Sequence, residues 1–377
     1  MKRRSILWVL FLGIAAIAVI AIACGGNGDD PSPTAPADGD TPAATEEPTA
    51  GSHSVTLGDV QDRGRLVCGV NDGVPGFGFL EPDGSSSGFD VDFCRALAAA
   101  VLGDSEAVDF VILTAAARFE ALSAGEIDVL IRNTTWTQSR DADLNATFAT
   151  ITFYDGQGMM VRVADGFDSI DDMEGATICV LKGTTTELNL EDRFASADLS
   201  YTPLTFDDNE TLEPAFTEAR CDGWTSDKSQ LASRRFVFPE DAGGPEALEI
   251  FPETFSKEPL GPVTRDDDSQ WSDVVNWVVI GMITADEKGI TSQNIDDFIA
   301  DPGDAETARL LGVSFEGGEI FDPDLGIELD FMQDVIRLVG NYDEVYQANI
   351  TPLGILREGT LNASWLDGGL IYAPPTR

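Results

Sequence analysis

The sequence predicts an α/β protein of two lobes, and three observations support this fold class. Two segments, 64–135 and 176–227, repeat one alternation of strand patterns with helix patterns, which is typical of mainly parallel sheets covered by helices. Two connecting stretches, 152–162 and 256–265, lead out of the first segment and away from the second. About 320 residues follow position 54, which is enough for two domains of ordinary size.

The elements follow one another in the same order in both segments. In the first segment the patterns predict strand, helix, strand, short helix and strand, in GRLVCGVN, GFDVDFCRALAAAVL, DFVILT, RFEALSAG and IDVLIRNTT. The first helix begins near Asp90 or Asp92, and Gly125 closes the short one. In the second segment the corresponding stretches are ATICVLKG, TELNLEDRFAS, LSYTPLTF, TLEPAFTEAR and CDGWTSD. Each segment therefore predicts a sheet of its own.

The last third of the chain contains a strongly apolar helix pattern, WSDVVNWVVIGMI, which begins at Trp271. The pattern is too short to span a membrane and charged residues flank it on both sides, so we expect a core helix. If the chain crosses back at 256–265, this third completes the first lobe. We therefore expect lobe 1 to comprise 55–155 plus 260–377, and lobe 2 to comprise 156–259.

The N-terminus has the pattern of a lipoprotein signal peptide. Three basic residues precede an uncharged apolar run at 6–23, and Cys24 follows directly. We expect residues 1–23 to be removed and Cys24 to carry a lipid, although Ala21 stands where such signals more often have Leu. The alternative is an uncleaved transmembrane anchor. Both alternatives place the rest of the chain outside the cytoplasm, at the cell membrane.

Residues 24–54 predict a flexible linker. They are rich in Pro, Gly, Ala, Thr and acidic residues and contain no large apolar side chain, so they cannot bury enough surface to offset the entropy of ordering. The linker holds His53, the only histidine of the chain. This inventory excludes Ser-His-Asp triads and sites built from several histidines.

The charge and the cysteines limit the partners further. A formal net charge of −43 argues against nucleic acid, whose binding relies on cationic contacts to phosphate. It does not prevent the binding of a small anion, because distant charges are screened beyond about 8 Å. With Cys24 lipidated, an even number of cysteines remains and suggests disulfides. Three connectivities are possible, and proximity favours Cys68 with Cys94 and Cys179 with Cys221. A zinc site is the alternative, but CxxC spacing and a histidine partner are both missing.

Polar and aromatic side chains follow the predicted strands at their carboxyl ends. These segments are NDGVPGFGF, RNTTWTQSR, LKGTTTE and TSDKS. In open parallel sheets, ligands bind outside the carboxyl ends of the strands. The sequence therefore predicts a ligand cleft between the two lobes.

Seven motifs in this chain resemble one family. They are GFDVDFC, SAGEIDVL, RNTTWT, YDGQG, GTTTELNL, KEPLGP and GGLIYAPPTR. Together they resemble the general amino-acid substrate-binding proteins of polar-amino-acid ABC transporters, which are family 3 extracellular solute-binding proteins. The resemblance runs from about residue 55 to the last residue. It implies the type II periplasmic-binding-protein fold, two α/β lobes joined by two crossover strands, and it favours cysteine pairing within each lobe.

The resemblance also implies a function without enzymatic activity or cofactor. A monomer captures a free L-amino acid, such as Glu, Asp, Gln, Asn or a broad set, by closing its lobes. It then delivers the amino acid to ABC permease subunits in the membrane.

By the same resemblance, Arg140 binds the α-carboxylate and Asp227 accepts hydrogen bonds from the α-ammonium group. An arginine fork matches a carboxylate geometrically, which suits the first role. The alternatives are a surface salt bridge of Arg140 with Asp141 or Asp143, and a helix N-cap for Asp227.

Further ligand contacts are expected on both sides of the cleft. Asn133 and Thr135 in lobe 1, and Gly183, Thr184 and Thr185 in lobe 2, would donate hydrogen bonds; phosphate binding is the competing interpretation of the second loop. Specificity would come from the side-chain end, where the family resemblance implies the following residues. Arg118 would bind a distal carboxylate or, alternatively, lie on a helix surface beside Glu120 or Glu126, and Phe77 and Phe79 would form an aromatic wall or, alternatively, belong to the core.

An enzyme on the same fold is the rival interpretation. Secreted dehydratases of the cyclohexadienyl or arogenate type resemble amino-acid-binding proteins and need a general acid or base in the cleft. Glu187, Glu210 and Asp155 are available carboxylates. Formation of product from prephenate would distinguish this enzyme from a binding protein.

Overall fold

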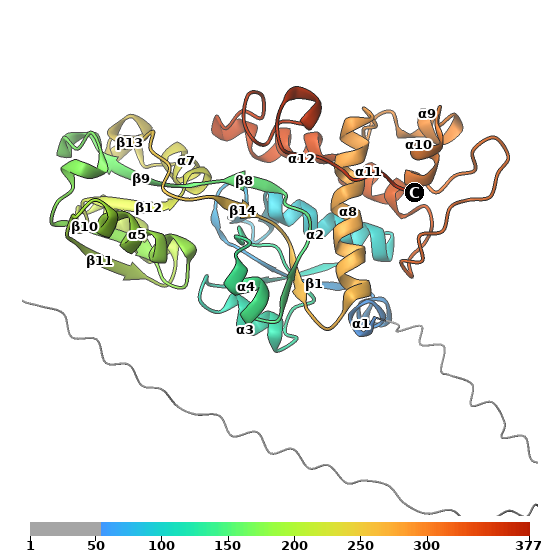
Figure 1. Cartoon of the computed structure of the whole chain (residues 1–377), viewed down its shortest axis with the longest axis horizontal. Helices are drawn as coiled ribbons and strands as arrows, with labels where there is room; N and C mark the ends of the chain where they lie inside the picture. The colour runs from blue at the N-terminus through green and yellow to red at the C-terminus, as the bar shows by residue number, and fades with distance from the viewer. Residues whose placement is uncertain (1–53) are drawn as a thin grey trace, which may run out of the picture. The chain divides into compact units, whose positions relative to one another are not determined.

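A computed structural model describes residues 54–377 (Figure 1). The predicted signal peptide, the predicted lipidation site Cys24 and the predicted linker lie outside the described residues, except for Ser54. That residue is the N-cap of helix α1 (Val55–Arg63), and its hydroxyl donates to Asp268 at 2.7 Å. Within residues 54–377, none of the helices combines the length and apolarity that a membrane crossing requires.

The first sheet has five strands in the order β5-β1-β6-β15-β7 and forms lobe 1. Strands β5, β1 and β6 run parallel, whereas β15 is antiparallel to both of its neighbours. The bounds are β1 Leu66–Val70, β5 Val108–Ile112, β6 Val129–Leu130, β7 Ala146–Phe148 and β15 Val263–Arg265. A hairpin sheet of β2 (Gly73–Val74), β3 (Gly78–Leu80) and β4 (Ser86–Ser87) follows β1.

The helices of lobe 1 come from both ends of its sequence. Helix α2 packs against α8, α11 and α12 from the last third of the chain, and apolar residues of these four helices form one buried cluster. Helix α8 is therefore a core helix. The bounds are α2 Phe89–Leu102, α3 Arg118–Ser123, α4 Gln138–Asp143, α8 Ser269–Glu287, α9 Ile295–Ala300, α10 Ala305–Leu310, α11 Phe331–Leu338 and α12 Tyr342–Asn349.

The second sheet, in lobe 2, repeats this plan with the order β11-β10-β12-β9-β13. Its three parallel strands come from the predicted alternating segment, and β9 is antiparallel to both β12 and β13. The bounds are β9 Gln157–Arg162, β10 Ala176–Leu181, β11 Tyr201–Phe206, β12 Gly223–Asp227, β13 Leu248–Ile250, α5 Thr185–Ser196, α6 Asn209–Thr217 and α7 Lys228–Phe236.

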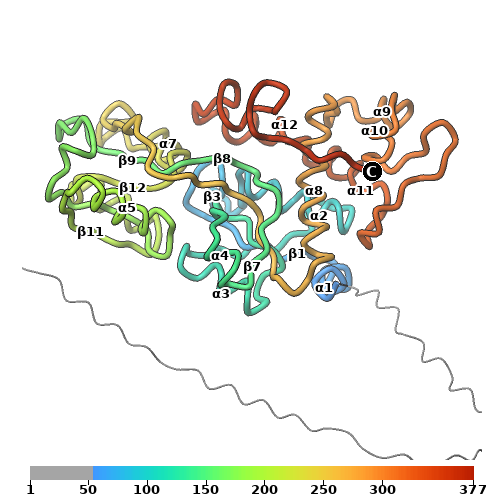
Figure 2. The backbone as a smooth tube through the Cα atoms, viewed as in Figure 1, coloured from blue at the N-terminus to red at the C-terminus, as the bar shows by residue number. Residues whose placement is uncertain are grey.

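Two antiparallel strands connect the sheets, β8 (Phe153–Asp155) and β14 (Glu258–Leu260). Figure 2 shows the two crossings, one green and one yellow to orange, side by side between the sheets. Each sheet is mainly parallel, as predicted, and one strand that adjoins a crossing, β15 in the first sheet and β9 in the second, runs against the other four.

The cysteine pairing favoured by proximity is confirmed. Cys68 in β1 bonds to Cys94 in α2, and Cys179 in β10 bonds to Cys221 just before β12. Each disulfide thus ties elements of one lobe together and leaves the crossings free to bend.

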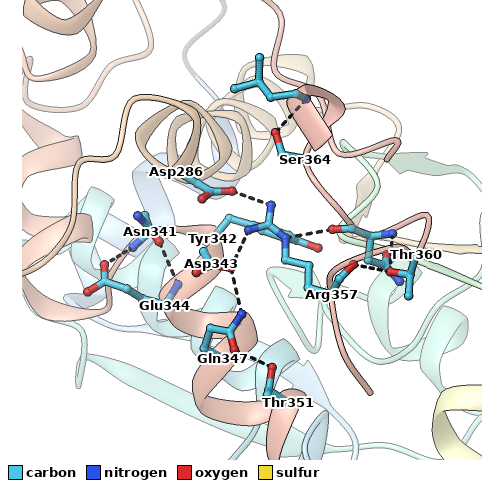
Figure 3. A network of polar contacts seen from close by, with 12 residues as sticks. Asp286, Asn341, Tyr342, Asp343, Glu344, Gln347, Thr351, Arg357, Thr360 and Ser364 are labelled. Atoms are coloured by element: carbon cyan, nitrogen blue, oxygen red, sulfur yellow. Dashed lines mark hydrogen bonds and ion pairs between the residues drawn. The ribbon is translucent and has the colours of Figure 1, made fainter. Parts of the chain in front are cut away.

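A buried ion network holds the last residues of lobe 1 against the first crossing strand. Arg357 donates to Asp286 at 2.6 Å and to Asp343 at 2.7 Å, and its guanidinium lies over the Tyr342 ring (Figure 3). The Tyr342 hydroxyl donates to the carbonyl of Thr152, just before β8, at 2.8 Å. The network therefore supports one end of the hinge.

We expect Arg357→Met to lower the free energy of unfolding by about 1.5–3 kcal/mol, because it removes charge-assisted hydrogen bonds to two partly buried carboxylates. Urea denaturation of the purified protein measures the loss. Arg337→Met is the control, since Arg337 pairs with the exposed Asp296 and such pairs contribute about 1 kcal/mol or less. Equal losses in the two variants would show that the network adds no more than a surface pair.

Candidate ligand-binding site between the lobes

A small cavity lies between the carboxyl ends of the two sheets. Both lobes contribute to its wall, and the contributing loops are those that follow β5, β6, β10 and β12. The predicted position of the cleft is therefore correct. The lining residues are Ala115, Arg118, Arg132, Asn133, Thr135, Leu181, Thr184, Thr185, Thr186, Ser226, Asp227 and Gln230.

Three buried arginines stand on the lobe 1 side. Arg132 donates through Nε to the carbonyl of Leu113 at 2.6 Å, and Arg140 donates through Nη1 to the carbonyl of Thr135 at 2.9 Å. The guanidinium carbons of Arg118 and Arg140 each lie 5.3 Å from the centre of the Phe119 ring. The Phe119 ring therefore holds both guanidinium groups close together through cation–π contacts. The sequence analysis did not identify this ring.

Of these three arginines, Arg118 has the side chain that most lacks hydrogen-bond partners. It is 3% exposed, and its Nε is buried without a hydrogen-bond partner among the described residues. Burial lowers the pKa of Arg118 well below its ordinary value, and the neighbouring Arg140 and Arg132 lower it further. The alternative of a helix-surface arginine does not fit a side chain buried in the cavity wall. A bound anion would supply what this group lacks.

The other two arginines differ in their relation to the cavity. Arg132 lines it, and burial lowers the pKa of Arg132 to about 10. Arg140 lies behind Thr135, outside the lining, but its field reaches Glu258 and Asp227 across the cavity. Its Nη1 has one partner, and its Nε and Nη2 make no hydrogen bond with the described residues. The alternative of a surface salt bridge with Asp141 or Asp143 does not fit this buried guanidinium.

Asp227 is the buried anion of the lobe 2 side. It occupies the N-cap position of α7, yet its side chain makes no capping hydrogen bond. Burial raises the pKa of Asp227 well above its ordinary value, and the nearby Asp155 and Glu258 raise it further. Because the capping role is not filled, the carboxylate remains available to a cation in the cavity.

The two crossing strands contribute carboxylates as well. Glu258 in β14 accepts a hydrogen bond from the Thr185 hydroxyl at 2.8 Å and another from Asn189 at 2.9 Å, so it positions the lobe 2 loop. Asp155 in β8 accepts from the backbone N–H of Ser229, and burial raises the pKa of Asp155 to about 6. The sequence offered a motif around Glu258, KEPLGP, but no reason to bring it against Thr185 of lobe 2.

The loop after β6 combines backbone strain with unsatisfied groups. Asn133 has a φ of 41°, which is rare outside glycine. Its N–H donates to Asp90 at 2.7 Å, while both polar atoms of its side chain are buried without a partner among the described residues. Such features gather at ligand-binding positions.

The threonine loop of lobe 2, which follows β10 and contains Thr184 and Thr185, approaches lobe 1 closely. The Thr185 hydroxyl lies 3.4 Å from that of Thr135, which is a contact between the lobes. The Thr184 hydroxyl caps α5 by accepting from the Glu187 N–H at 3.0 Å. Gly183 is not in the lining; its N–H donates to Glu187, and a Cβ at Gly183 would lie 3.0 Å from Ala116 of lobe 1. Thr184 and Thr185 thus reach the cavity, and Gly183 permits the approach.

The two phenylalanines expected as an aromatic wall lie elsewhere. Phe77 is fully buried in lobe 1, in edge-to-face contact with Phe89 and Phe153. Phe79 is half-buried in β3, where it pairs with Gly73 and Ser87. Neither ring lines the cavity, and Phe77 packs instead against Phe89 of α2 and Phe153 of β8.

Ligand binding should release protons. In the ligand-free cavity the pKa of Asp227 is raised, whereas an ammonium group beside it favours the carboxylate and lowers that pKa again. The affinity for a ligand that carries an ammonium group should therefore fall as the pH falls through the raised pKa. Calorimetry in two buffers of different ionisation enthalpy measures the protons released. A binding enthalpy that is the same in both buffers at every pH would contradict this linkage.

A family model described as bacterial extracellular solute-binding proteins, family 3, matches residues 66–293. This chain belongs to that family. The match begins at β1 and extends past α8, so it includes both sheets and every residue that lines the cavity. The resemblance seen in the sequence is therefore confirmed.

Individual relatives are similar over most of the chain. The glutamate/glutamine/aspartate/asparagine-binding protein BztA of Rhodobacter capsulatus is 45% identical over 325 residues, which cover 85% of this chain and 93% of the relative. The general L-amino acid-binding periplasmic protein AapJ of Rhizobium johnstonii is 45% identical over 86% of this chain and 93% of its own length. A periplasmic binding protein of Brucella ovis, solved with glutathione bound, is 43% identical with a TM-score of 0.80, covering 86% of this chain and 100% of that chain. The predicted fold is thereby confirmed.

Proposed function

We propose that this protein captures a free L-amino acid in the cavity between its lobes and delivers it to an ABC importer. The observation that carries the proposal is the division of charge in the cavity. Buried arginines stand on the lobe 1 side, and the buried Asp227 stands on the lobe 2 side. An amino acid carries a carboxylate and an ammonium group. It can pair with the arginines of lobe 1 and with Asp227 of lobe 2 at the same time only when the lobes are closed.

The α-carboxylate is assigned to Arg140, helped by Thr135 and Asn133, and the α-ammonium group to Asp227. The free N–H groups of Arg140 and its electrostatic link to Asp227 support this assignment. Closure follows because the ligand has a higher affinity for the closed state, where both charges meet their partners. The protein would act as a monomer outside the cytoplasm, held by a lipid on Cys24, and permease subunits would recognise its closed form.

Two features favour acidic amino acids and their amides as ligands. Arg118 and Arg132 offer cationic groups beyond the one assigned to the α-carboxylate, and the relative BztA is described as binding glutamate, glutamine, aspartate and asparagine. Glutathione belongs among the test ligands, because the Brucella ovis relative was solved with it and its γ-glutamyl end carries the same α-carboxylate and α-ammonium groups. The relatives named above are described as binding proteins, which favours a binding protein over a dehydratase.

A thermal-shift screen over the standard amino acids, glutathione and prephenate tests the proposal. Ligands at 100 times their Kd should add about 2.7 kcal/mol to the free energy of unfolding and raise the melting temperature by several degrees. We expect glutamate or a related amino acid to give the largest shift. A response to prephenate with formation of product, and none to amino acids, would replace the proposal with the dehydratase function.

Arg118→Ala should remove the preference for a distal carboxylate. We expect affinity for glutamate and aspartate to fall about tenfold or more, since a charge-assisted hydrogen bond contributes about 1.5–3 kcal/mol, while glutamine binding changes less. Isothermal titration with the four ligands measures this selectivity. Arg95→Ala is the control, because Arg95 pairs with Asp92 away from the cavity. Unchanged selectivity in Arg118→Ala would assign the distal group to another residue.

A further inference from the structure

The lobes also meet at a second place, beside the cavity. The carbonyl oxygen of Gly73, in β2 of lobe 1, accepts hydrogen bonds from two side chains of lobe 2. Arg234 in α7 donates through Nη2, and Asn209, the first residue of α6, donates through Nδ2 at 3.3 Å. All three residues are buried. The contact joins positions that are 136 and 161 residues apart in the chain.

Both donors are held in position by bonds within lobe 2. Arg234 donates through Nη1 to Glu213 of α6 at 2.7 Å. Asn209 accepts through Oδ1 from Gln230 of α7 at 3.0 Å, and this bond orients its amide so that Nδ2 faces Gly73. Gln230 also lines the ligand cavity. The donors are therefore ordered by their own lobe and connected to the ligand site through one side chain.

The acceptor is equally well positioned on lobe 1. The side chain of Asn71 accepts from the N–H groups of Asp72 and Gly73, at 3.0 and 3.3 Å, which orders the turn before β2. A Cβ at Gly73 would lie 2.8 Å from Arg234 Nη2, and its next nearest atoms belong to Asn209. Glycine at this position thus permits the approach of lobe 2, and the first atoms that a Cβ would meet belong to the other lobe.

We propose that Gly73, Asn209 and Arg234 form a closure latch, which exists only when the lobes are closed and which sets how fast a ligand leaves. The inference rests on the proposed function, since it concerns closure on a ligand. A contact made in the closed state alone stabilises that state and slows its opening, without touching the ligand. Because Gln230 joins the latch to the cavity wall, a ligand that orders Gln230 also orders Asn209.

Stopped-flow kinetics with L-glutamate and L-glutamine as probes tests the latch. We expect Gly73→Ala and Arg234→Met to raise the dissociation rate constant about tenfold or more, while the association rate constant changes by less than about threefold. The melting temperature of the ligand-free protein should be unchanged in Gly73→Ala, because the nearest contacts of the added methyl group are to Arg234 and Asn209 of lobe 2. Gly73→Ala therefore distinguishes an effect on the dissociation rate from an effect on folding stability, even if Arg234→Met destabilises α6 and α7.

Two matched controls make the same kinds of substitution at positions outside the latch. Gly58→Ala adds a methyl group that has no atom within 4 Å, and Arg235→Met removes a guanidinium that bonds to Pro245 inside lobe 2. Both controls should retain the wild-type dissociation rate. Dissociation rates in Gly73→Ala and Arg234→Met equal to those of the controls would overturn the latch.

A measurement without ligand separates failure of the latch from failure of the proposed function. If the wild-type protein binds neither probe nor any other amino acid, the proposed function is wrong, and small-angle X-ray scattering then tests the latch by itself. We expect Gly73→Ala to shift the ligand-free protein toward a larger radius of gyration than Gly58→Ala. Identical scattering of the two variants would contradict the latch, whatever the natural ligand is.

Discussion

Asp227→Asn is expected to weaken amino-acid binding about 100-fold or more while leaving the ligand-free protein at least as stable as the wild type. The loss follows because truncating or neutralising one partner of a buried charge pair costs about 2–5 kcal/mol in binding. The unchanged stability follows because burial raises the pKa of this carboxyl group and its side chain caps no helix. An ionised group in that position is unfavourable until a ligand pairs with it, which is a typical cost of a functional site.

Isothermal titration and thermal denaturation of the same preparations test both parts of this result. Asp207→Asn is the matched control, because Asp207 is an exposed lobe 2 carboxylate that pairs with Lys182. The control should bind like the wild type. If Asp227→Asn binds like the control, the ammonium partner is another residue, and Asp155 and Glu258 are the nearest alternatives.

Arg140→Ala is expected to abolish amino-acid binding without unfolding the protein. Its guanidinium holds the Thr135 carbonyl and leaves further N–H groups free, so the variant loses both a cation and the order of the loop after β6. We expect a loss of about 100-fold or more for every amino acid, acidic or neutral, because the α-carboxylate is common to all of them. This uniform loss contrasts with the selective loss expected for Arg118→Ala.

Two further variants test the role of Arg140: one separates its charge from its geometry, and the other is a control. Arg140→Lys keeps the positive charge but not the planar fork, and we expect it to recover only part of the affinity. Arg65→Ala, which removes an exposed arginine paired with Asp109 in the same lobe, should bind normally. Wild-type affinity in Arg140→Ala, measured by the same titration, would leave Arg118 or Arg132 as the α-carboxylate partner.

Much of the site could be predicted from the sequence because its residues follow strands. The positions after β6, β10 and β12 are read directly from the alternation of patterns, and in a parallel arrangement those ends meet at one edge. Thr135, Thr184 and Asp227 were predicted in this way together with the family resemblance, and all three line the cavity.

The remaining placements depended on packing that local patterns do not encode. Phe77 belongs to an aromatic cluster with residues of α2 and β8 instead of the cavity. Arg132, to which the sequence analysis assigned no role, lines the cavity, whereas Arg140 is not among the lining residues. Gln230 was not predicted at all, since a polar residue on an amphipathic helix is ordinarily solvated. These outcomes depend on which faces meet after the lobes assemble.

The sequence by itself predicted the alternating elements and the two crossings, favoured the cysteine pairs within each lobe and showed a resemblance to the family. These are local or short-range properties, set by hydrophobic periodicity and by proximity along the chain. Only the tertiary structure decided that β9 and β15 run antiparallel to their sheets, that Glu258 positions the threonine loop and that Arg234 bonds to Gly73. The physical reason is that each of these features joins residues far apart in the chain, whose meeting depends on how two folded lobes face each other.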